Sequence, residues 1–132
     1  MKHLLIALFT LPMVMAGFDA QSQSTTVTNN AFNYWCYYEI EIHYTENNKC
    51  GPIGSTTHII GPSSTINVPY PDPSVEAEYV EVRSLSSPGR NAVYQIIRCG
   101  AAFPAVQFID DDCQVFVTFT ESAPNVLVSI DP

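Results

Sequence analysis

Hydrophobic and polar residues alternate most regularly in residues 34–45. One face of this segment would carry Tyr34, Cys36, Tyr38, Ile40, Ile42 and Tyr44, and the other Trp35, Tyr37, Glu39, Glu41, His43 and Thr45. A period of two, with one apolar and one largely polar face, is typical of a half-buried antiparallel strand. The pattern predicts one long unbroken strand whose apolar face packs into the core.

Shorter alternating runs follow, separated by residues that favour turns. They predict strands at residues 56–60, 65–70, 78–85, 92–99, 105–109, 113–120 and 126–130. Residues 92–99 are apolar on both faces, which predicts a central strand. Pro69 predicts a sheet edge or a strand end, because proline lacks the N–H that a ladder needs. The turn at residues 86–90 predicts a hairpin.

No window of the chain shows a sustained helical period. We therefore expect an all-β fold, an antiparallel β-sandwich of about seven to eight strands of immunoglobulin-like or transthyretin-like kind, with a small barrel as the alternative. The segment before residue 30 is rich in Ser, Thr, Asn and Gln. It predicts a flexible lead-in to about residue 30, or a weak first strand at residues 25–28.

The N-terminal segment has the features of a secretory signal peptide. Lys2 precedes an apolar run at residues 4–15, and Val14 and Ala16 place small residues before an expected cleavage after residue 16. The run is too short to span a bilayer. We therefore expect a signal peptide at residues 1–16 and a single domain at residues 17–132 that does not insert into a membrane. The protein would be exported to the periplasm, the cell surface or the exterior.

The net charge of the chain restricts the kinds of partner that we expect it to bind. The whole chain has five Lys and Arg against 13 Asp and Glu, a net charge of −8, and loss of Lys2 makes it −9. An acidic surface repels phosphate backbones, so we expect no nucleic-acid partner. The charge also favours solubility outside the cell.

The four cysteines of the expected mature chain predict two disulfides. They lie at positions Cys36, Cys50, Cys99 and Cys113. If residues 36–45 are extended, they cover about 30 Å, and the next five residues reach back at most about 17 Å. Because a bridge needs Cα atoms within about 7 Å, neighbour pairing requires the strand to break near His43. Otherwise the bridges join the two halves of the chain, as Cys36–Cys99 with Cys50–Cys113 or as Cys36–Cys113 with Cys50–Cys99.

Several acidic residues are candidates for catalysis or for cation binding. Glu39 and Glu41 share a strand face about 7 Å apart, a distance compatible with the acid and base of a small glycoside hydrolase. A solvated strand face is the simpler interpretation.

Asp110, Asp111 and Asp112 could bind a cation but lack the ligand spacing of a calcium loop, so an acidic turn is favoured. No catalytic or zinc motif occurs, and we expect a protein that is not an enzyme and has no cofactor or metal.

The aromatic residues of the predicted strand suggest binding. Trp35 and Tyr37 would share the polar face with Glu39, Glu41 and His43, and these five residues form the candidate binding site. Exposed aromatic side chains are typical anchors for protein partners or sugar rings. The alternative is that a second sheet or the N-terminal segment covers them.

These features together resemble small secreted β-sandwich proteins of Gram-negative bacteria. The resemblance rests on the signal peptide, one acidic domain, four cysteines and the Gly-Pro-Ser-Ser-Thr break at residues 61–65. It implies a non-enzymatic binding or structural module, an accessory part of a larger outer-membrane or surface assembly that acts through a sheet face or an exposed edge strand. A carbohydrate-binding module is the first alternative, and a small hydrolase the second.

Overall fold

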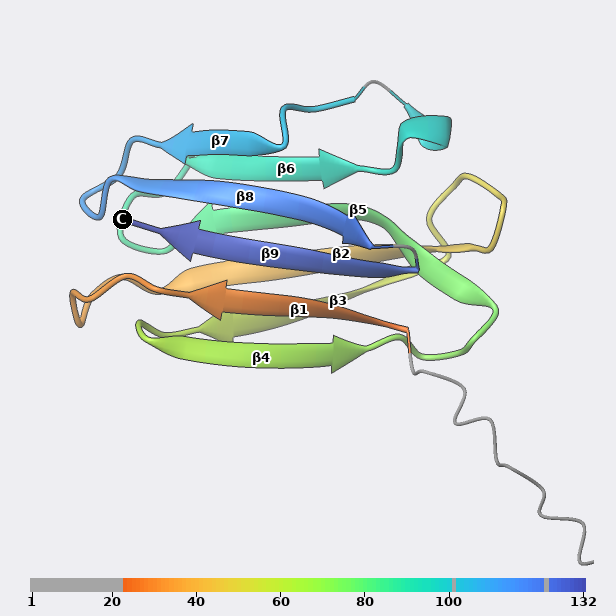
Figure 1. Ribbon diagram of the computed structural model, residues 1–132, viewed down its shortest axis with the longest axis horizontal. Coiled ribbons are helices and arrows are strands. Elements are labelled where there is room, and N and C mark those ends of the chain that lie inside the picture. Colours follow the sequence, from red (N-terminus) through yellow and green to blue (C-terminus); the bar gives the residue numbers. More distant parts are fainter. Residues whose placement is uncertain (1–22, 101, 123) are drawn as a thin grey trace, which may run out of the picture.

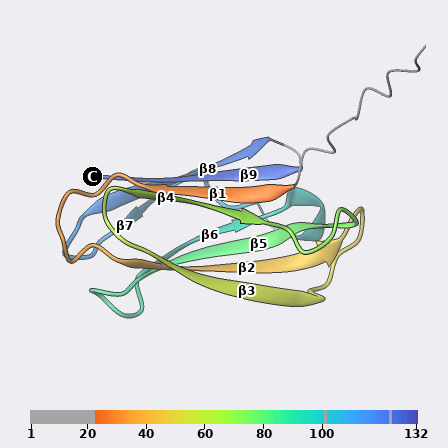
Figure 2. The same cartoon turned by 90° about the horizontal axis from the view of Figure 1, so that it is seen from below.

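The computed structural model describes residues 23–100, 102–122 and 124–132, which form nine strands in two facing sheets (Figures 1 and 2). The five-stranded sheet has the order β4–β1–β9–β8–β7, and the four-stranded sheet the order β3–β2–β5–β6. The strands are β1 Ser24–Asn29, β2 Tyr38–Glu46, β3 Gly54–Ile60, β4 Ser64–Pro69, β5 Val75–Ser84, β6 Asn91–Gln95, β7 Val106–Ile109, β8 Val115–Ser122 and β9 Asn125–Asp131. A short 3₁₀ helix, η1 (Ile97–Cys99), follows β6. None of the helical structure described is long and apolar enough to cross a bilayer.

The predicted all-β, sandwich-like class is confirmed, with one or two more strands than expected. One pairing departs from the antiparallel rule, because β1 runs parallel to β9 and antiparallel to β4. Outward residues alternate with buried ones along the strands, as the period of two predicts. The expected signal peptide, residues 1–16, lies outside the described residues.

A flexible lead-in extending to about residue 30 is wrong for residues 24–29, which form β1. The alternative of a first strand at residues 25–28 matches the structure. Val27 and Thr25 are fully buried between the sheets, and β-branched side chains suit this pleated environment. Because the segment is polar in composition, its sequence gives only a weak signal for β1, which lies between β4 and β9.

The long strand predicted at residues 34–45 begins four residues later, at Tyr38. Tyr34 and Trp35 form a turn, in which the Cys36 N–H donates to the carbonyl of Asn33 at 3.0 Å. The turn is needed because the chain crosses here from the five-stranded sheet to the four-stranded sheet. From Tyr38 onward the predicted inward face is buried. A register shift after His43 then buries Thr45, which was expected to face outward.

The run at residues 92–99 does not form a central strand. β6 ends at Gln95, lies at the edge of the four-stranded sheet, and is followed by η1. Its outer edge is nevertheless covered by the side chain of Gln107, which explains why an edge strand can be largely apolar. The Val93 N–H donates to Gln107 Oε1 at 3.0 Å, and Gln107 Nε2 donates to the Val93 carbonyl.

Two disulfides close the two ends of the sandwich, and they join the two halves of the chain. They are Cys36–Cys113 and Cys50–Cys99, so the second of the two crossed pairings is the correct one. We call the end with Cys36–Cys113 the aromatic pole and the end with Cys50–Cys99 the opposite pole. In Figure 1 these lie at the left and right of the molecule. Between them the core consists of side chains from both sheets, such as Ile40, Val82 and Val117.

Candidate functional site

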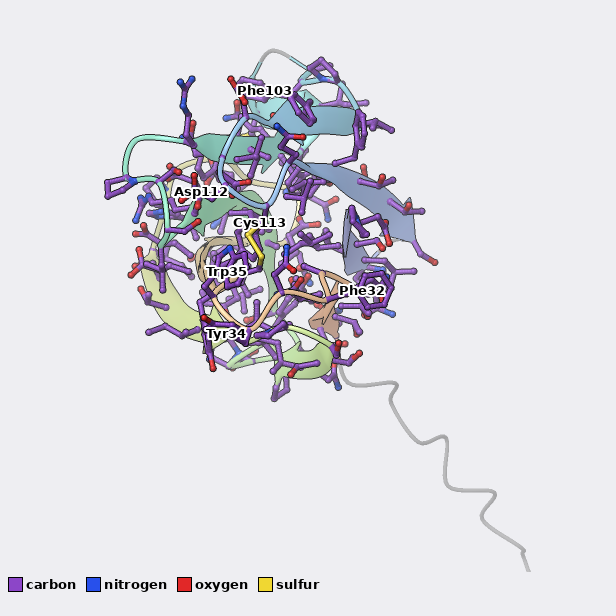
Figure 3. All side chains as sticks on the ribbon, turned by 90° about the vertical axis from the view of Figure 1, so that its left-hand side faces the viewer. Phe32, Tyr34, Trp35, Phe103, Asp112 and Cys113 are labelled. Atoms are coloured by element: carbon purple, nitrogen blue, oxygen red, sulfur yellow. A yellow bond between two sulfur atoms is a disulfide. The ribbon has the colours of Figure 1, made fainter. Side chains whose placement is uncertain are left out.

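Four large aromatic side chains are exposed on one connection at the aromatic pole. Residues 30–37, here called the aromatic loop, link β1 to β2, and Phe32, Tyr34, Trp35 and Tyr37 are 84%, 79%, 45% and 44% exposed. Tyr34 and Trp35 contact each other edge to face, with ring centroids 4.7 Å apart. Figure 3, which looks onto this pole, shows Tyr34 and Trp35 together and Phe32 to one side. Exposed aromatic groups of this density form a surface suited to binding.

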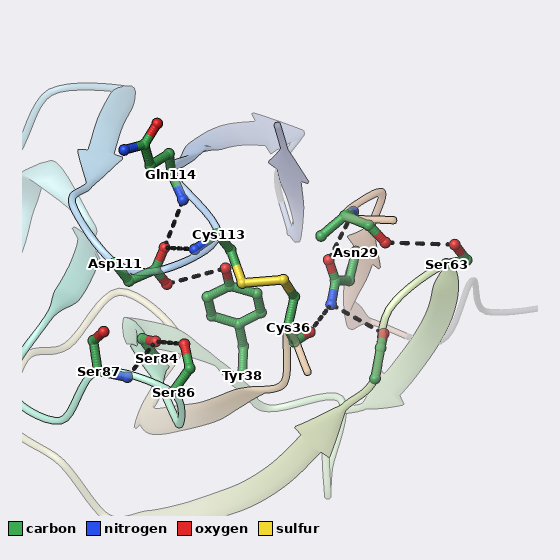
Figure 4. Close-up of a disulfide and its surroundings, with 12 residues drawn as sticks. Asn29, Cys36, Tyr38, Ser63, Ser84, Ser86, Ser87, Asp111, Cys113 and Gln114 are labelled. Atoms are coloured by element: carbon green, nitrogen blue, oxygen red, sulfur yellow. Dashed lines mark hydrogen bonds between the residues drawn. A yellow bond between two sulfur atoms is a disulfide. The ribbon is translucent and has the colours of Figure 1, made fainter. Parts of the chain in front are cut away.

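The aromatic loop is held at its base by a buried amide. The side chain of Asn29, at the end of β1, is fully buried and makes three hydrogen bonds. Its Nδ2 donates to the carbonyls of Cys36 at 2.9 Å and Gly61 at 3.0 Å, and its Oδ1 accepts from the N–H of Ala31 at 3.1 Å (Figure 4). Both N–H donors and the oxygen of the amide are thus hydrogen-bonded, as burial requires. One side chain therefore ties both ends of the loop to the β3–β4 connection.

A second buried group fixes the neighbouring turn between β7 and β8. Asp111 Oδ1 accepts hydrogen bonds from the N–H groups of Cys113 at 2.9 Å and Gln114 at 2.8 Å. Its Oδ2 accepts from the hydroxyl of Tyr38 at 3.1 Å. Burial, followed by the charge of Asp111, raises the pKa of Tyr38 well above its usual value. Because Cys113 is bonded to Cys36, this turn and the aromatic loop form one cross-linked frame (Figure 4).

The three aspartates of that turn do not form a common site. Asp111 is buried and faces the backbone and Tyr38, whereas Asp110 and Asp112 are exposed. Across residues 23–100, 102–122 and 124–132, no three His, Cys, Asp or Glu side chains are placed to hold a metal ion. Asp111 acts as the capping residue of a tight turn, a usual role for aspartate.

The predicted binding residues separate into two groups. Glu39, Glu41 and His43 lie on the outer face of β2. Trp35 and Tyr37 belong to the aromatic loop instead, because the strand begins after them. Their separation follows from the turn at residues 34–35.

On the outer face of β2, the carboxylates are occupied by one guanidinium. Arg83 of β5 donates to Glu39 at 2.8 Å, to Glu41 at 2.6 Å and to Glu81 at 2.7 Å. Hydrogen bonding to Glu81, with smaller effects of Glu39 and Glu41, raises the pKa of Arg83. Burial acts to raise the pKa of Glu81, but hydrogen bonds from Arg83 and Asn91 outweigh it and lower that pKa.

This arrangement supports an ion-pair network rather than acid–base chemistry. His43 Nε2 lies 3.0 Å from Glu41 Oε1, so Glu41 is held on both sides. A glycosidase acid needs a protonated carboxyl near neutral pH, usually produced by an apolar environment. Glu39 and Glu41 instead lie on an exposed sheet face, where both accept hydrogen bonds from the guanidinium of Arg83.

Sequence analysis missed Phe32 and Tyr34 as exposed residues. The predicted strand places Tyr34 on its inward face, and Phe32 falls between the expected lead-in and that strand. A shallow depression of about 380 Å³ lies beside Phe32 and is lined otherwise by uncharged polar residues. These are Thr28, Asn30, Ser63, Ser64 and Thr65. The clustering of aromatic residues at positions 32–38 was the available signal.

A second apolar surface lies on the outer face of the five-stranded sheet. Phe108 of β7 and Phe116 of β8 are about half exposed, with ring centroids 5.0 Å apart, and Val106 and Leu127 are also exposed. Phe116 points outward from β8, between the buried residues Val115 and Val117. This surface has two exposed aromatic side chains, against four on the aromatic loop.

Comparison with protein-family models, with curated proteins and with solved structures finds no match to the chain.

Proposed function

We propose that the protein is an exported, non-enzymatic binding module that docks on a larger protein through its aromatic loop. The observation that carries this proposal is the exposure of Phe32, Tyr34, Trp35 and Tyr37 on one cross-linked connection. Trp and Tyr are the residues most enriched among binding hot spots. A loop already ordered by Asn29 and a disulfide loses little conformational freedom on binding.

The setting of the proposed function is an oxidising compartment, the periplasm or the cell surface. Two disulfides support export, because such bonds persist mainly outside the reducing cytosol. The net charge of −8 favours a partner whose surface is basic around the contact. This setting agrees with the resemblance to small secreted β-sandwich proteins of Gram-negative bacteria.

Trp35 is the single tryptophan, so its fluorescence reports on the loop in the wild type, and calorimetry, which needs no tryptophan, compares the wild type with the variants. The partner is first recovered from the native host with the tagged protein, then purified and titrated against the wild type and two variants. Trp35→Ala removes a loop anchor, and Phe116→Ala removes an aromatic side chain of similar exposure on the five-stranded sheet. We expect Trp35→Ala to weaken binding at least about tenfold and Phe116→Ala to change it less than about twofold. Equal affinity of the wild type and Trp35→Ala would reject the aromatic loop as the docking site.

The depression beside Phe32 favours a second candidate function, the binding of a neutral glycan. An aromatic ring next to hydroxyl and amide groups, without a charge, matches the mixed surface of a sugar. Calorimetric titration with neutral oligosaccharides tests this candidate. A glycan that binds the wild type and not Phe32→Ala would favour it, and unchanged heats across the series would reject it.

A further inference from the structure

The four sheet edges of the described chain differ in how they are protected. The edge of β6 is capped by Gln107, β7 has only four residues, and β4 carries Pro69. β3 has seven residues without proline or a formally charged side chain, and among the residues described it pairs only with β2. Proteins normally protect edges with proline, charge, bulges or short strands, because open edges accept further strands. β3 has none of these devices.

The ladder register shows which backbone groups of β3 are open. The N–H of Leu85 donates to the carbonyl of Tyr37 at 3.0 Å, so alternate residues of β2, starting with Tyr37, hydrogen-bond to β5. The residues between them hydrogen-bond to β3, because both backbone groups of one strand residue point to the same side. Their partners on β3 are Thr56, His58 and Ile60. The backbone N–H and C=O groups of Ser55, Thr57 and Ile59 therefore face the open edge.

The two sheets also differ in width on the side of the sandwich where β3 and β4 form the edges. One sheet has five strands and the other four, and Gln107 joins their edges at β6 and β7. The unmatched strand is therefore β4, at the other flank. Figure 1 shows β4 beyond β3 at the lower margin, and Figure 2 shows the two strands in separate layers. The inward side chain of Ile66 on β4 is only partly buried. A fifth strand next to β3 would lie beneath it.

A polar atom on β3 lacks a partner at the same flank. His58 Nε2 is buried and makes no hydrogen bond. Buried polar atoms without a partner are uncommon and are usually satisfied by water or a ligand. In an antiparallel pairing at the open edge, the residue opposite His58 would be a non-hydrogen-bonded pair, in which the two side chains lie close together.

We propose that β3 is a strand-acceptor edge, which binds an extended segment of a partner protein antiparallel to β3. Inward residues of this segment would be apolar beneath Ile66, with a hydroxyl-bearing residue opposite His58. Outward residues would be basic, since the outer face of the four-stranded sheet gathers Glu39, Glu41 and Glu81 around a single arginine. All strand pairs of this sheet are antiparallel, which sets the direction. The inference does not use the aromatic loop.

The probe is the blocked peptide acetyl-Lys-Val-Lys-Thr-Lys-Val-Lys-amide, whose lysines face outward and whose valines and threonine face inward. It is titrated against isotope-labelled protein while amide signals are followed by NMR. We expect the largest shifts and new exchange protection at Ser55, Thr57 and Ile59. The same peptide N-methylated at its lysine amides should bind at least about tenfold more weakly, because it cannot donate to the β3 edge. This comparison leaves the protein unchanged.

Two variants complete the test. Thr57→Pro removes an open backbone donor and should weaken peptide binding about tenfold, whereas Thr57→Val keeps the backbone and should retain binding. Trp35→Ala should leave peptide binding unchanged, which separates this proposal from the aromatic loop. The proposal is overturned by no binding at millimolar peptide, by equal binding of the N-methylated peptide, or by shifts centred on β4 or the aromatic loop. A dimer of the protein that Thr57→Pro abolishes would also overturn it, in favour of a second copy.

Discussion

The two poles of the sandwich are each closed by a disulfide, yet they are built differently. At the aromatic pole, Cys36 is fully buried, and the buried side chains of Asn29 and Asp111 hold the connections. At the opposite pole, Cys50 is exposed, and the contacts around the bridge include surface ion pairs and one hydrogen bond from the Gly51 N–H to the carboxylate of Glu78 at 3.1 Å. Arg98 there donates to Glu76 and, at 2.8 Å, to the carbonyl of Lys49.

The difference shows that the two poles are stabilised in different ways. Buried polar groups are costly unless every hydrogen bond is made, and when made they specify one conformation. Surface ion pairs contribute little and tolerate movement. The aromatic pole therefore resembles a preorganised site that displays four aromatic side chains. The opposite pole mainly links loops, so substitutions there should cost less stability than substitutions at the aromatic pole.

The largest effect is expected from removing the bridges. The double variant Cys36→Ala/Cys113→Ala should lose about 3–5 kcal/mol of unfolding free energy, and Cys50→Ala/Cys99→Ala about 2–3 kcal/mol. The sequence separations of 77 and 49 residues account for only roughly 0.4 kcal/mol of the difference. The remainder reflects the burial of Cys36, whose replacement leaves a void. Urea unfolding measures both variants, and equal losses would contradict the contrast between the poles.

Next, removing the buried amide of Asn29 at the aromatic pole should lower the free energy of unfolding more than removing the exposed amide of Asn47 at the opposite pole. Asn29→Ala leaves the backbone groups of Cys36, Gly61 and Ala31 without their partners. We expect a loss of about 2–4 kcal/mol. The matched variant Asn47→Ala removes one exposed hydrogen bond to the carbonyl of Pro73 and should cost less than about 0.5 kcal/mol. Thermal unfolding of the pair is the measurement, and similar melting temperatures would contradict the prediction.

Alkaline pH should reduce the stability of the fold, because it ionises one buried tyrosine at each pole. Burial raises the pKa of Tyr70 to about 12, and the Tyr38 pKa is raised further because Asp111 lies beside it. Both folded pKa values exceed the unfolded value of about 10, so their contribution to stability is complete below pH 10 and is lost as pH rises. For Tyr70 the loss falls between pH 10 and about 12.

Urea unfolding across this range tests the alkaline prediction. Tyr70→Phe should flatten the decline of stability between pH 10 and about 12, because phenylalanine does not ionise. The part of the tyrosinate absorbance that Tyr70→Phe removes should then rise together with loss of β structure in circular dichroism. Ionisation of all tyrosines at pH 10 with the fold intact would show that these hydroxyls are not buried in solution.

The smallest effect is expected at the ion pairs of the opposite pole. Arg98→Gln removes the charge that faces Glu76, and the change should cost less than about 1 kcal/mol. Because the pair is partly exposed, added salt should reduce the difference from the wild type. Chemical unfolding at low and high ionic strength measures it. A loss comparable to that of Asn29→Ala would mean that both poles depend on specific polar contacts.

The fold class and the inward faces could be predicted from the sequence because they depend on local periodicity. Tyr38, Ile40 and Ile42 face inward as predicted. The candidate site was predicted only in part: Trp35 and Tyr37 are exposed, which the sequence left open, and they do not share a face with Glu39 and Glu41. The aromatic clustering at positions 32–38 marks Phe32 as unusual, but its exposure depends on how the loop passes between the sheets and could not be predicted.

The sequence by itself determined which residues alternate between core and solvent, since side chains on a strand point to opposite sides whatever the neighbouring strands are. It also restricted the crossed cysteine pairings to two. The tertiary structure decided between them, because the choice depends on which loops meet at each pole. It likewise decided that β2 begins at Tyr38, that Arg83 reaches the glutamates of β2, and that β3 has an open edge. These features depend on contacts between residues distant in the chain, which no local pattern specifies.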